Sequence, residues 1–467
     1  MPVPPAGTAL AGGTNGPRAL SPLLDIVLDA LTTGAEDRAG PLPAGGPDAV
    51  AHAVRTACAP LLPEHGTGAH HALRTLVHTL AAGAADPADP HCAAHLHCPP
   101  LALATAADLA AGALNPSMDS WDQAPAASEL EALTCRELAA LVYPRATAPD
   151  TLVTTGGTES NQVAVLLARE AATGTAPLQM VCGANAHHSL HRAAWLLGLP
   201  QPLTLPTPDG TLTPATVHTC LANLTGRTGP VLLTATAGTT DSGAIDPLPD
   251  LADLADHYGA RFHIDASYAG PLLFSTTHHT ALHGLDRAHT VTLDLHKLGW
   301  QPVAAGLLAV PDPTALTPLA HQADYLNADD DTEAGLPDLL GRSLRTTRRP
   351  DILKIAVTLK ALGRTGLGEL VDRTLAAART LADLIEAHPR YELHSRPTLS
   401  TVLFRPTGAD PATLATIRRT LLTDGHAVLG RATTPTGLWL KATLLNPHTQ
   451  PGDLTTLLKL VEGHTPR

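Results

Sequence analysis

The chain has 467 residues, of which 44% are hydrophobic and 16% charged, a composition typical of a globular protein with a sizeable core and room for two or three domains. Its formal net charge of -13 argues against nucleic acid as a partner, because affinity for phosphate backbones needs clustered Lys and Arg. No apolar stretch is long enough to span a membrane, and residues 1–20 lack a basic region followed by an apolar one. We therefore expect a cytoplasmic protein without a membrane partner.

The first part of the chain has a helical pattern. Residues 1–48 are rich in Gly, Pro and Ala and contain one short helical run, "SPLLDIVLDALTTG", and we expect the ends of this segment to be mobile. From residue 48 to about 140 the apolar residues recur mostly at helical spacing. The prediction is a helical N-terminal segment over residues 1–134, with its first part mobile.

In the centre of the chain the apolar residues follow a different pattern. Between about 150 and 310, short apolar runs such as "DTLVTTGG", "PLQMVCG" and "GPVLLTATAG" alternate with helix-length segments. This alternation predicts βαβ units around a mostly parallel buried sheet, in a large domain over residues 135–347. Long helical runs, two strand candidates ("STVLFRP" and "GLWLKATLL") and a terminal helix follow Pro350. They predict a smaller α+β domain over residues 348–467, and the fold class is α/β.

The first strand to end in residues suited to chemistry is "DTLVTT". It is followed by Gly156, Gly157 and Thr158, where a helical pattern begins at once. Glycines that expose backbone N–H groups at a helix N-terminus, together with a hydroxyl, can hold a phosphate. The structural alternative is a glycine turn with a Thr or Ser helix cap.

Two later strand ends carry a histidine and an aspartate. His187 follows "PLQMVCG" and can stack on a flat ring or orient a substrate, although in a chain with 25 histidines it can equally be a surface residue. Asp265 closes "ARFHIDA". A carboxylate at the end of a buried strand needs a positive partner, which a protonated pyridine nitrogen provides; the alternative is an aspartate that caps a turn.

A lysine follows a further strand, the fourth to end in residues suited to chemistry. "HTVTLDL" places Asp294, His296 and Lys297 at its end. Desolvation disfavours the ammonium form of such a lysine and makes its amine nucleophilic, unless the side chain simply snorkels to solvent. A phosphate cradle, a stacking histidine, an aspartate and a strand-end lysine on successive strand–helix units are what a pyridoxal 5′-phosphate site needs. The sequence therefore predicts this cofactor.

Longer stretches resemble the group II pyridoxal-phosphate-dependent amino-acid decarboxylases over about residues 90–465. The matching runs include "TTGGTESN", "ANAHHSLHRAA", "HIDASYAG", "DLHKLGWQP" and "TTRRPDILK". The resemblance implies the fold type I of pyridoxal-phosphate enzymes, which is aspartate aminotransferase-like, with a mostly parallel seven-stranded sheet in the large domain. It also implies decarboxylation of an L-amino acid to its amine and CO2.

The same resemblance assigns roles to residues of the cofactor site. Lys297 looks like the Schiff-base lysine, His187 like the ring-stacking histidine, and Asp265 like the partner of the pyridine nitrogen. Thr239 or Thr240 resembles the threonine beside the ring oxygen, and Thr240 is preferred. The positions that resemble phosphate contacts are Gly157, Thr158 and His296.

Other matches concern the substrate and the proton donor. Tyr325 matches the mobile-loop tyrosine that protonates the α-carbon in the family, with a loop anchor as the alternative. Lys441 falls where glutamate decarboxylases carry a carboxylate-binding arginine. The pocket-lining segment of the family corresponds to Trp121, Asp122 and the residues up to Pro125.

The family branch suggests the substrate. The sequences of the motifs "AHLHCP", "SMDSWDQAP" and "ADYLN" most resemble those of decarboxylases of L-2,4-diaminobutyrate and L-lysine. A distal ammonium would need an acidic partner, for which Asp122 is the candidate with Asp119 behind it; either can instead be a helix-end or turn carboxylate. Gly299, where an aromatic often follows the lysine, leaves room for a bulkier side chain and keeps aromatic or other neutral amino acids as the alternative. Ser267 and Glu159 also depart from the usual pattern, and little effect is expected from either.

Other function classes stay open at this point. One is a pyridoxal-phosphate-dependent transaminase or aldehyde synthase, although an aldehyde synthase of this family typically has phenylalanine in place of Tyr325. Another is a non-catalytic interaction protein. The family further implies a homodimer with composite active sites. No metal is predicted, because "HCAAHLHC" at 91–98 matches no zinc spacing, the six cysteines show no paired CxxC motif, and "ADDDTE" at 328–333 fits a solvated loop.

Overall fold

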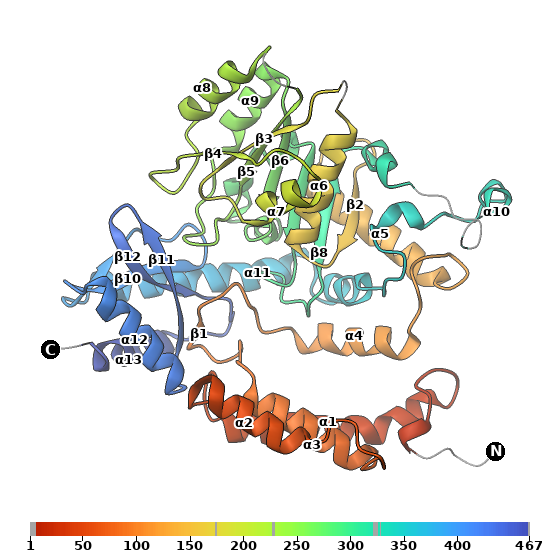
Figure 1. Cartoon of the computed structure of the whole chain (residues 1–467), viewed down its shortest axis with the longest axis vertical. Coiled ribbons are helices and arrows are strands. Elements are labelled where there is room, and N and C mark those ends of the chain that lie inside the picture. The colour runs from red at the N-terminus through yellow and green to blue at the C-terminus, as the bar shows by residue number, and fades with distance from the viewer. Residues whose placement is uncertain (1–5, 173–174, 227–228, 321–325, 327, 466–467) are drawn as a thin grey trace.

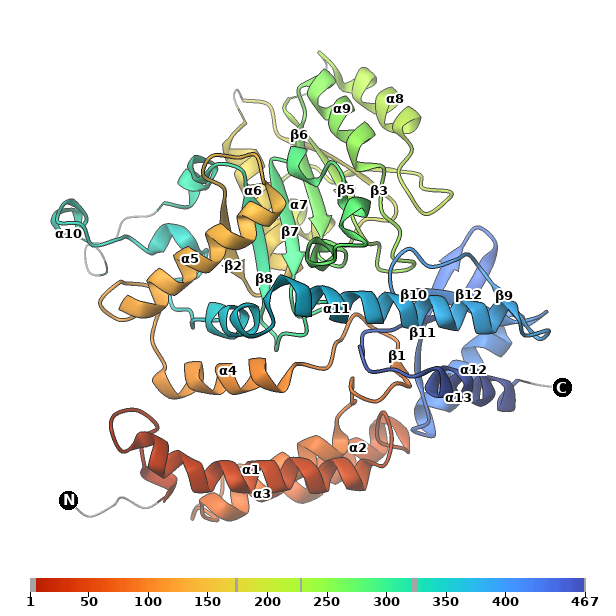
Figure 2. The same cartoon turned by 180° about the vertical axis from the view of Figure 1, so that it is seen from behind.

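The computed structural model describes residues 6–172, 175–226, 229–320, 326 and 328–465. Its N-terminal part is a layer of three helices that lies below α4 (Ala102–Leu114) in Figures 1 and 2. The three helices are α1 (Gly16–Arg38), α2 (Gly46–Cys58) and α3 (Ala69–Gly83). The first is longer than expected, because a proline in its first turn starts it early and it continues to a left-handed cap at Ala39. Within the described residues, no helix is both long and apolar enough to cross a bilayer.

The large domain is built on a seven-stranded sheet in the order β2-β8-β7-β6-β5-β3-β4. Only β8 runs antiparallel to its neighbours, so the predicted mostly parallel sheet is confirmed. Its strands β7 and β8 are buried along their whole length, as expected of strands covered on both faces. The short edge strand β4 was not predicted, since three residues are too few to show a period. The strands are β2 (Asp150–Thr154), β3 (Gln179–Gly183), β4 (Leu203–Leu205), β5 (Val231–Thr236), β6 (Arg261–Ala266), β7 (Thr290–Asp294) and β8 (Gly306–Val310).

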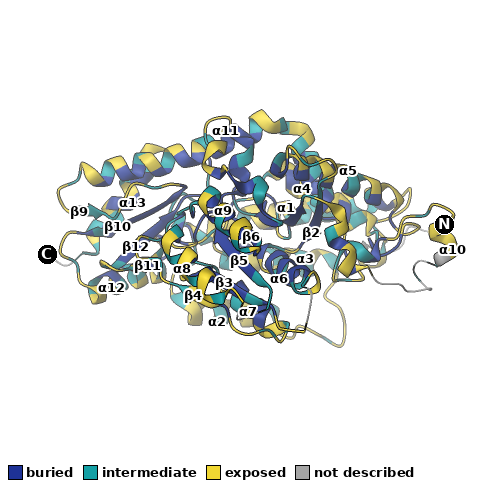
Figure 3. Cartoon of the chain, turned by 90° about the horizontal axis from the view of Figure 1, so that it is seen from above, coloured by how far each residue is buried: buried dark blue, intermediate teal, exposed yellow. Residues whose placement is uncertain are grey.

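Helices cover both faces of this sheet (Figures 1 and 2). On one face α6 (Gly157–Glu170) and α7 (Ser189–Leu196) bury their apolar sides against the strands. The other face is covered by α5 (Pro125–Val142), α8 (Pro214–Leu224), α9 (Leu248–Tyr258) and the first half of α11 (Ile352–Glu386). Figure 3 shows the strands as the buried layer between helices whose outer sides are exposed. The apolar core therefore holds the strand ends in fixed positions.

The C-terminal part contains a five-stranded sheet in the order β1-β11-β12-β10-β9. Two of its strands were predicted, whereas β1, β9 and β11 were not. The first, β1, comes from the N-terminal segment and pairs in parallel with β11. The elements are β1 (Cys92–Ala93), β9 (Tyr391–Leu393), β10 (Thr401–Pro406), β11 (Val428–Thr434), β12 (Gly437–Thr443), α12 (Pro411–Thr423) and α13 (Pro451–Gly463).

One helix runs across an expected boundary between the three parts, and another joins the two sheets. The predicted break after residue 134 falls inside α5, and α11 connects the two sheets with a kink at Gly363, whose φ is 62°. The kink falls inside the first of the two long helical runs after Pro350, "DILKIAVTLKALGRTG". The division into three domains stays a prediction. Short elements complete the chain: α10 (Asp329–Glu333) and 3-10 helices at Ala6–Thr8, Gly270–Phe274, His279–Leu282, Leu285–Arg287, Pro313–Leu319 and Leu340–Arg342.

Candidate active site

A cavity of about 320 Å³ opens where the carboxyl ends of β2, β3, β5, β6 and β7 meet. Because these strands run in the same direction, the residues that follow them reach the same edge of the sheet. The cavity is large enough for a small organic ligand. Seven of the residues singled out in the sequence line it: Gly157, Thr158, His187, Thr240, Asp265, His296 and Lys297.

The cradle at the start of α6 requires glycine. A Cβ on Gly157 would lie 2.3 Å from Oγ of Ser267, and a Cβ on Gly156 would lie 3.0 Å from the ring of His296. On the other side, a Cβ on Gly306 would come within 2.4 Å of the Gly156 backbone. The closely packed turn leaves the N-terminal N–H groups of the 14-residue helix facing the cavity, which suits a phosphate.

Asp265 is a buried carboxylate that accepts three hydrogen bonds. Its Oδ1 accepts from the backbone N–H (3.0 Å) and the hydroxyl (2.6 Å) of Ser267, and its Oδ2 accepts from Nδ2 of Asn161 at 2.7 Å. Desolvation is the largest influence and raises the pKa of Asp265, but the ammonium of Lys297 and these hydrogen bonds outweigh it and hold the pKa below its usual value. The carboxylate is therefore ionised at neutral pH and can face a cationic ring nitrogen.

His187 lies beside Asp265 and is oriented through its Nδ1. The backbone N–H of Ser189 donates to this nitrogen at 3.3 Å, and the Ser189 hydroxyl lies 2.9 Å from it. Since Nδ1 accepts, the ring proton sits on Nε2. Burial lowers the pKa of His187 below its ordinary value, so the ring is neutral at neutral pH. The Ser189 hydroxyl also accepts from Asn161, which links His187 to Asp265.

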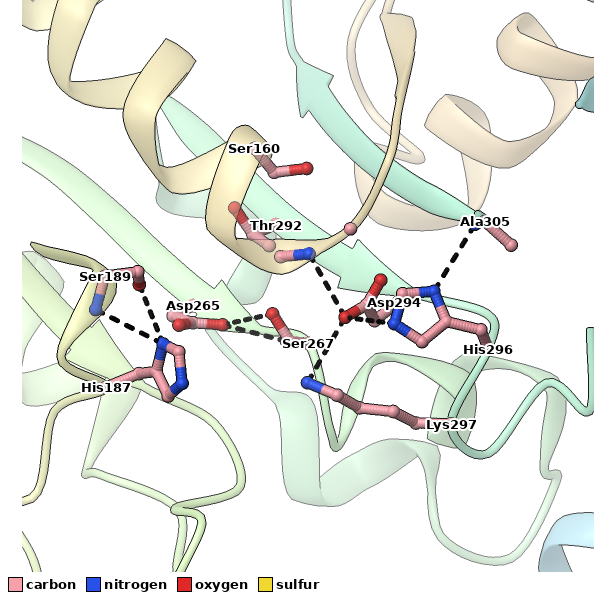
Figure 4. Close-up of polar contacts among 12 residues, drawn as sticks. Ser160, His187, Ser189, Asp265, Ser267, Thr292, Asp294, His296, Lys297 and Ala305 are labelled. Atoms are coloured by element: carbon pink, nitrogen blue, oxygen red, sulfur yellow. Dashed lines mark hydrogen bonds and ion pairs between the residues drawn. The ribbon is translucent and has the colours of Figure 1, made fainter. Parts of the chain in front are cut away.

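Lys297 points toward Asp294 at the end of β7 (Figure 4). Its Nζ lies 3.2 Å from Oδ2 of Asp294, and Nε2 of His296 lies 3.2 Å from the same oxygen. The backbone N–H of Gly157 donates to that oxygen at 3.1 Å. Figure 4 shows His187 and Asp265 at one end of this group and Asp294 and His296 at the other, with Ser267 between them. One cavity thus holds N–H groups that can donate to an anion, the amine of Lys297 and the ionised carboxylate of Asp265.

Thr240 and Lys441, two further predicted site residues, lie at the cavity or next to it. Thr240 lines it, whereas Thr239 is buried and its hydroxyl accepts from the backbone N–H of Ala244. Nζ of Lys441, on β12, donates to the backbone oxygen of Thr240 at 3.2 Å and lies 3.9 Å from Asp241. Burial lowers the pKa of Lys441, an effect partly offset by Asp241. Lys441 therefore brings a cationic side chain from the C-terminal sheet to the rim.

The predicted substrate segment is not part of this cavity within one chain. Trp121, Asp122 and Pro125 are exposed at the approach to α5, and none of them lines it. Asp122 accepts from the Ser120 hydroxyl at 2.5 Å, and Asp119 accepts from Gln123 at 2.8 Å. Trp121 instead lines a second cavity, of about 390 Å³. Tyr325, the predicted proton donor, lies outside the described residues.

Gly299 does not widen the cavity, which corrects the expectation of a roomier substrate pocket. A Cβ at this position would lie 2.6 Å from the backbone oxygen of Leu295 and 2.8 Å from its Cα. The turn after Lys297 therefore folds back on the end of β7 too closely for any side chain. Gly299 is therefore needed for the backbone turn that carries Lys297, and it gives no information on the size of the substrate.

Replacing Gly299 with alanine is expected to destabilise the protein, because the new methyl group would meet backbone atoms that cannot give way locally. We expect a loss of about 1–3 kcal/mol in the free energy of unfolding, measured by urea denaturation. The matched control is Gly452→Ala in the first turn of α13, where nothing lies within 4 Å of the new Cβ. A Gly299→Ala variant as stable as this control would contradict the steric account.

No metal ligand set gathers at the cavity among the residues that the structure describes. Among the described residues, one group of three side chains could hold an ion: Asp424, His426 and His464. This group does not line the cavity. In the run 91–98, Cys98 is buried and donates its S–H to the backbone oxygen of His296 at 3.2 Å. Burial raises the pKa of this thiol to about 12. Residues 91–98 therefore contact the turn that carries Lys297 through the hydrogen bond of the neutral Cys98 thiol.

Four polar residues of the site were not assigned a role from the sequence. They are Asn161, Ser189, Ser267 and Asp294. Ser267 was expected to have little effect, yet its hydroxyl is one of the shortest contacts of Asp265. Asn161 also accepts from Thr292 at 2.7 Å and lies 3.1 Å from the buried His263, whose pKa burial lowers to about 4. All four stand inside runs that carry the family resemblance, and only their contacts reveal what they do.

Comparisons with known proteins identify the family of the chain. A family model described as "Pyridoxal-dependent decarboxylase conserved domain" matches residues 59–407. The chain is 39% identical over 423 residues to L-2,4-diaminobutyrate decarboxylase of Rhizobium meliloti (strain 1021), and the match covers 87% of this chain and 84% of the relative. It is 31% identical over 438 residues to L-2,4-diaminobutyrate decarboxylase of Acinetobacter baumannii, covering 86% and 85%.

A solved structure is similar over nearly the whole length. It is the glutamate decarboxylase domain of diaminobutyrate-pyruvate transaminase and L-2,4-diaminobutyrate decarboxylase from Vibrio parahaemolyticus. The TM-score is 0.86 at 30% sequence identity, with 98% of each chain covered. The similarity thus includes the N-terminal helices and the C-terminal sheet as well as the cavity.

Proposed function

The chain belongs to the pyridoxal-dependent decarboxylase family and is a pyridoxal-phosphate-dependent amino-acid decarboxylase, and from this premise we propose that its substrate is a diamino acid, with L-2,4-diaminobutyrate first and L-lysine second. The observation that carries the activity is the single cavity in which Lys297, Asp265 and the glycine cradle of α6 meet. The observation that favours the substrate is the similarity to two L-2,4-diaminobutyrate decarboxylases.

The residues present fit the cofactor. The cradle has no room for a Cβ at Gly157, so backbone N–H groups can approach a phosphate. We assign Gly157, Thr158 and His296 to the phosphate, His187 to the ring face, Asp265 to the ring nitrogen, Thr240 to the ring oxygen side and Lys297 to covalent attachment.

When bound, the cofactor supplies an electron sink for the electron pair left as CO2 departs from the α-carbon. The residues of this chain do the rest. Asp265 stays ionised and can hold a proton on the ring nitrogen, while His187, fixed through Ser189, presents a neutral ring face. A general acid must then deliver a proton to the α-carbon, and Tyr325 is the proposed donor.

A Tyr325→Phe variant is expected to shift the product from amine to aldehyde. Without the donor, the α-carbon is protonated slowly and can react with O2 and water, which gives the aldehyde, ammonia and hydrogen peroxide beside CO2. The measurement is the ratio of amine to aldehyde, with peroxide as a second readout, in air and under argon. An unchanged amine yield would mean that another group is the acid.

The substrate proposal has a direct test. The purified enzyme is given L-2,4-diaminobutyrate, L-ornithine, L-lysine and L-glutamate, together with an aromatic and a small neutral amino acid, and release of amine and CO2 is measured for each. We expect the diamino acids to give the highest kcat/KM. If all three fail while a neutral or aromatic amino acid is decarboxylated efficiently, the diamino-acid assignment is wrong and the cofactor assignment still stands.

A homodimer with composite sites is also proposed. Exposed large apolar side chains gather on the N-terminal helices, among them Leu28, Leu76 and Leu80, and such a surface suits a second copy of the chain. Trp121 and Asp122 are exposed as well, so they are free to reach a neighbour's cavity. Light scattering should give twice the chain mass.

The expected cytoplasmic location stays a prediction.

Mixing two defective variants tests whether the sites are shared. If Tyr325 of one copy serves the cavity of the other, a mixed dimer of Lys297→Ala and Tyr325→Phe chains has one site with both defects and one intact site. An equal mixture that exchanges subunits should then recover about a quarter of the wild-type amine formation. The amine yield of the unmixed Tyr325→Phe enzyme is the baseline, and no gain above it would count against shared sites.

A further inference from the structure

Asp294 has an unusual position, because it is an anion placed among the donors of an anion site. We propose that its carboxylate is an internal anion that occupies the phosphate cradle of the cofactor-free protein, and that the phosphate of the cofactor must displace it. The inference rests on the cofactor assignment and adds a residue that controls cofactor loading. Its basis is the geometry around Oδ2 of Asp294 (Figure 4).

Three donors converge on this one oxygen. They are the backbone N–H of Gly157 at 3.1 Å, Nε2 of His296 at 3.2 Å and Nζ of Lys297 at 3.2 Å. The histidine proton is placed by its other nitrogen: the backbone N–H of Ala305 donates to Nδ1 at 3.3 Å, so the proton sits on Nε2 and faces Asp294. All three contacts are therefore donor-to-carboxylate contacts.

The same donors are those that the phosphate needs. Gly157 begins α6 and His296 lines the cavity, and both are assigned to the phosphate above. Each N–H can serve the carboxylate or a phosphate oxygen, but it cannot serve both fully. The carboxylate is 2% exposed, so the repulsion between it and an arriving phosphate is poorly screened by water. Loading therefore requires the carboxylate to give up its donors.

The exchange also changes the setting of Lys297. In the cofactor-free protein its amine is held beside the carboxylate of Asp294. A phosphate that takes the donors of Oδ2 weakens this arrangement and lets Nζ turn toward the cavity. Phosphate capture and release of the amine are then one event, and Asp294 acts as a positioning residue for both.

Inorganic phosphate is the probe that isolates this step, since it forms no covalent bond with Lys297. Cofactor-free full-length protein is titrated with phosphate by calorimetry, for the wild type and for Asp294→Asn and Asp294→Ala. We expect both variants to bind phosphate more tightly, by about tenfold or more, because the competing charge is gone. Asp294→Asn should bind tightest, since its amide can also donate to a phosphate oxygen. Far-ultraviolet circular dichroism checks that each variant is folded.

The control is Asp265→Asn, which removes one negative charge from the same cavity without touching the donors of the cradle. Its phosphate affinity should change by less than about threefold. Unchanged or weaker phosphate binding in both Asp294 variants would overturn the proposal, as would tightening in Asp294→Asn alone, which would make the new amide the cause. Failure of wild-type protein to bind pyridoxal 5′-phosphate would instead contradict the function itself.

Discussion

Changing Lys297 to alanine is expected to reduce decarboxylation by at least about 10³-fold, because the variant loses the amine that attaches the cofactor and releases the product. The side chain is held at the end of a fully buried strand, with its Nζ beside Asp294, and no other lysine lines the cavity among the residues described. CO2 release from the preferred amino acid measures the loss. Absorbance of the purified protein, before and after denaturation, shows whether cofactor is retained without a covalent bond.

Two comparisons make this result specific. Lys360→Ala, at an exposed position on α11, controls for the removal of one lysine and should keep full activity. Addition of a small amine such as methylamine to the Lys297→Ala variant should restore part of the activity, since a free amine can take over the missing attack. Wild-type turnover in the variant would refute the assignment of Lys297.

The Asp265→Asn variant should keep bound cofactor and lose about 10²-fold to 10³-fold in kcat, because a neutral amide cannot hold a proton on the ring nitrogen. The native carboxylate is 5% exposed, and its hydrogen bonds and the nearby Lys297 keep its pKa below the ordinary value. It is therefore ionised across the working pH range, and the loss in the variant should persist from pH 6 to pH 9. Activity is compared at equal cofactor content.

Charge and shape are separated by a second variant. Asp265→Glu keeps the charge but displaces it, so it should retain more activity than Asp265→Asn. Asp253→Asn, an exposed aspartate on α9, is the control for charge removal elsewhere in the domain. If Asp265→Asn decarboxylates as fast as the wild type, the ring nitrogen does not depend on this residue.

The sequence by itself determined the sheet and the main residues of the cavity. Alternation of apolar runs with helix-length segments predicted the mostly parallel sheet, and parallel strands bring the polar residues that follow them to one edge of that sheet. Gly157, His187, Asp265 and Lys297 meet there for that reason. This prediction needs only the strand directions, which the helical segments between successive strands imply.

Contacts between distant parts of the chain were decided only by the tertiary structure. Asn161 on α6 reaches Asp265 on β6, and Asp294 on β7 reaches the first N–H of α6, pairs separated by more than 100 positions in sequence. Gly299 gives a similar lesson, since its missing side chain is explained by the backbone of Leu295 and not by the ligand. The exposed Trp121 and Asp122 lie outside the cavity of their own chain, although their motif shares the family resemblance with the motifs that line it. Residue type and order fix which element a side chain belongs to, whereas its partners depend on how elements pack, and packing is a property of the whole fold.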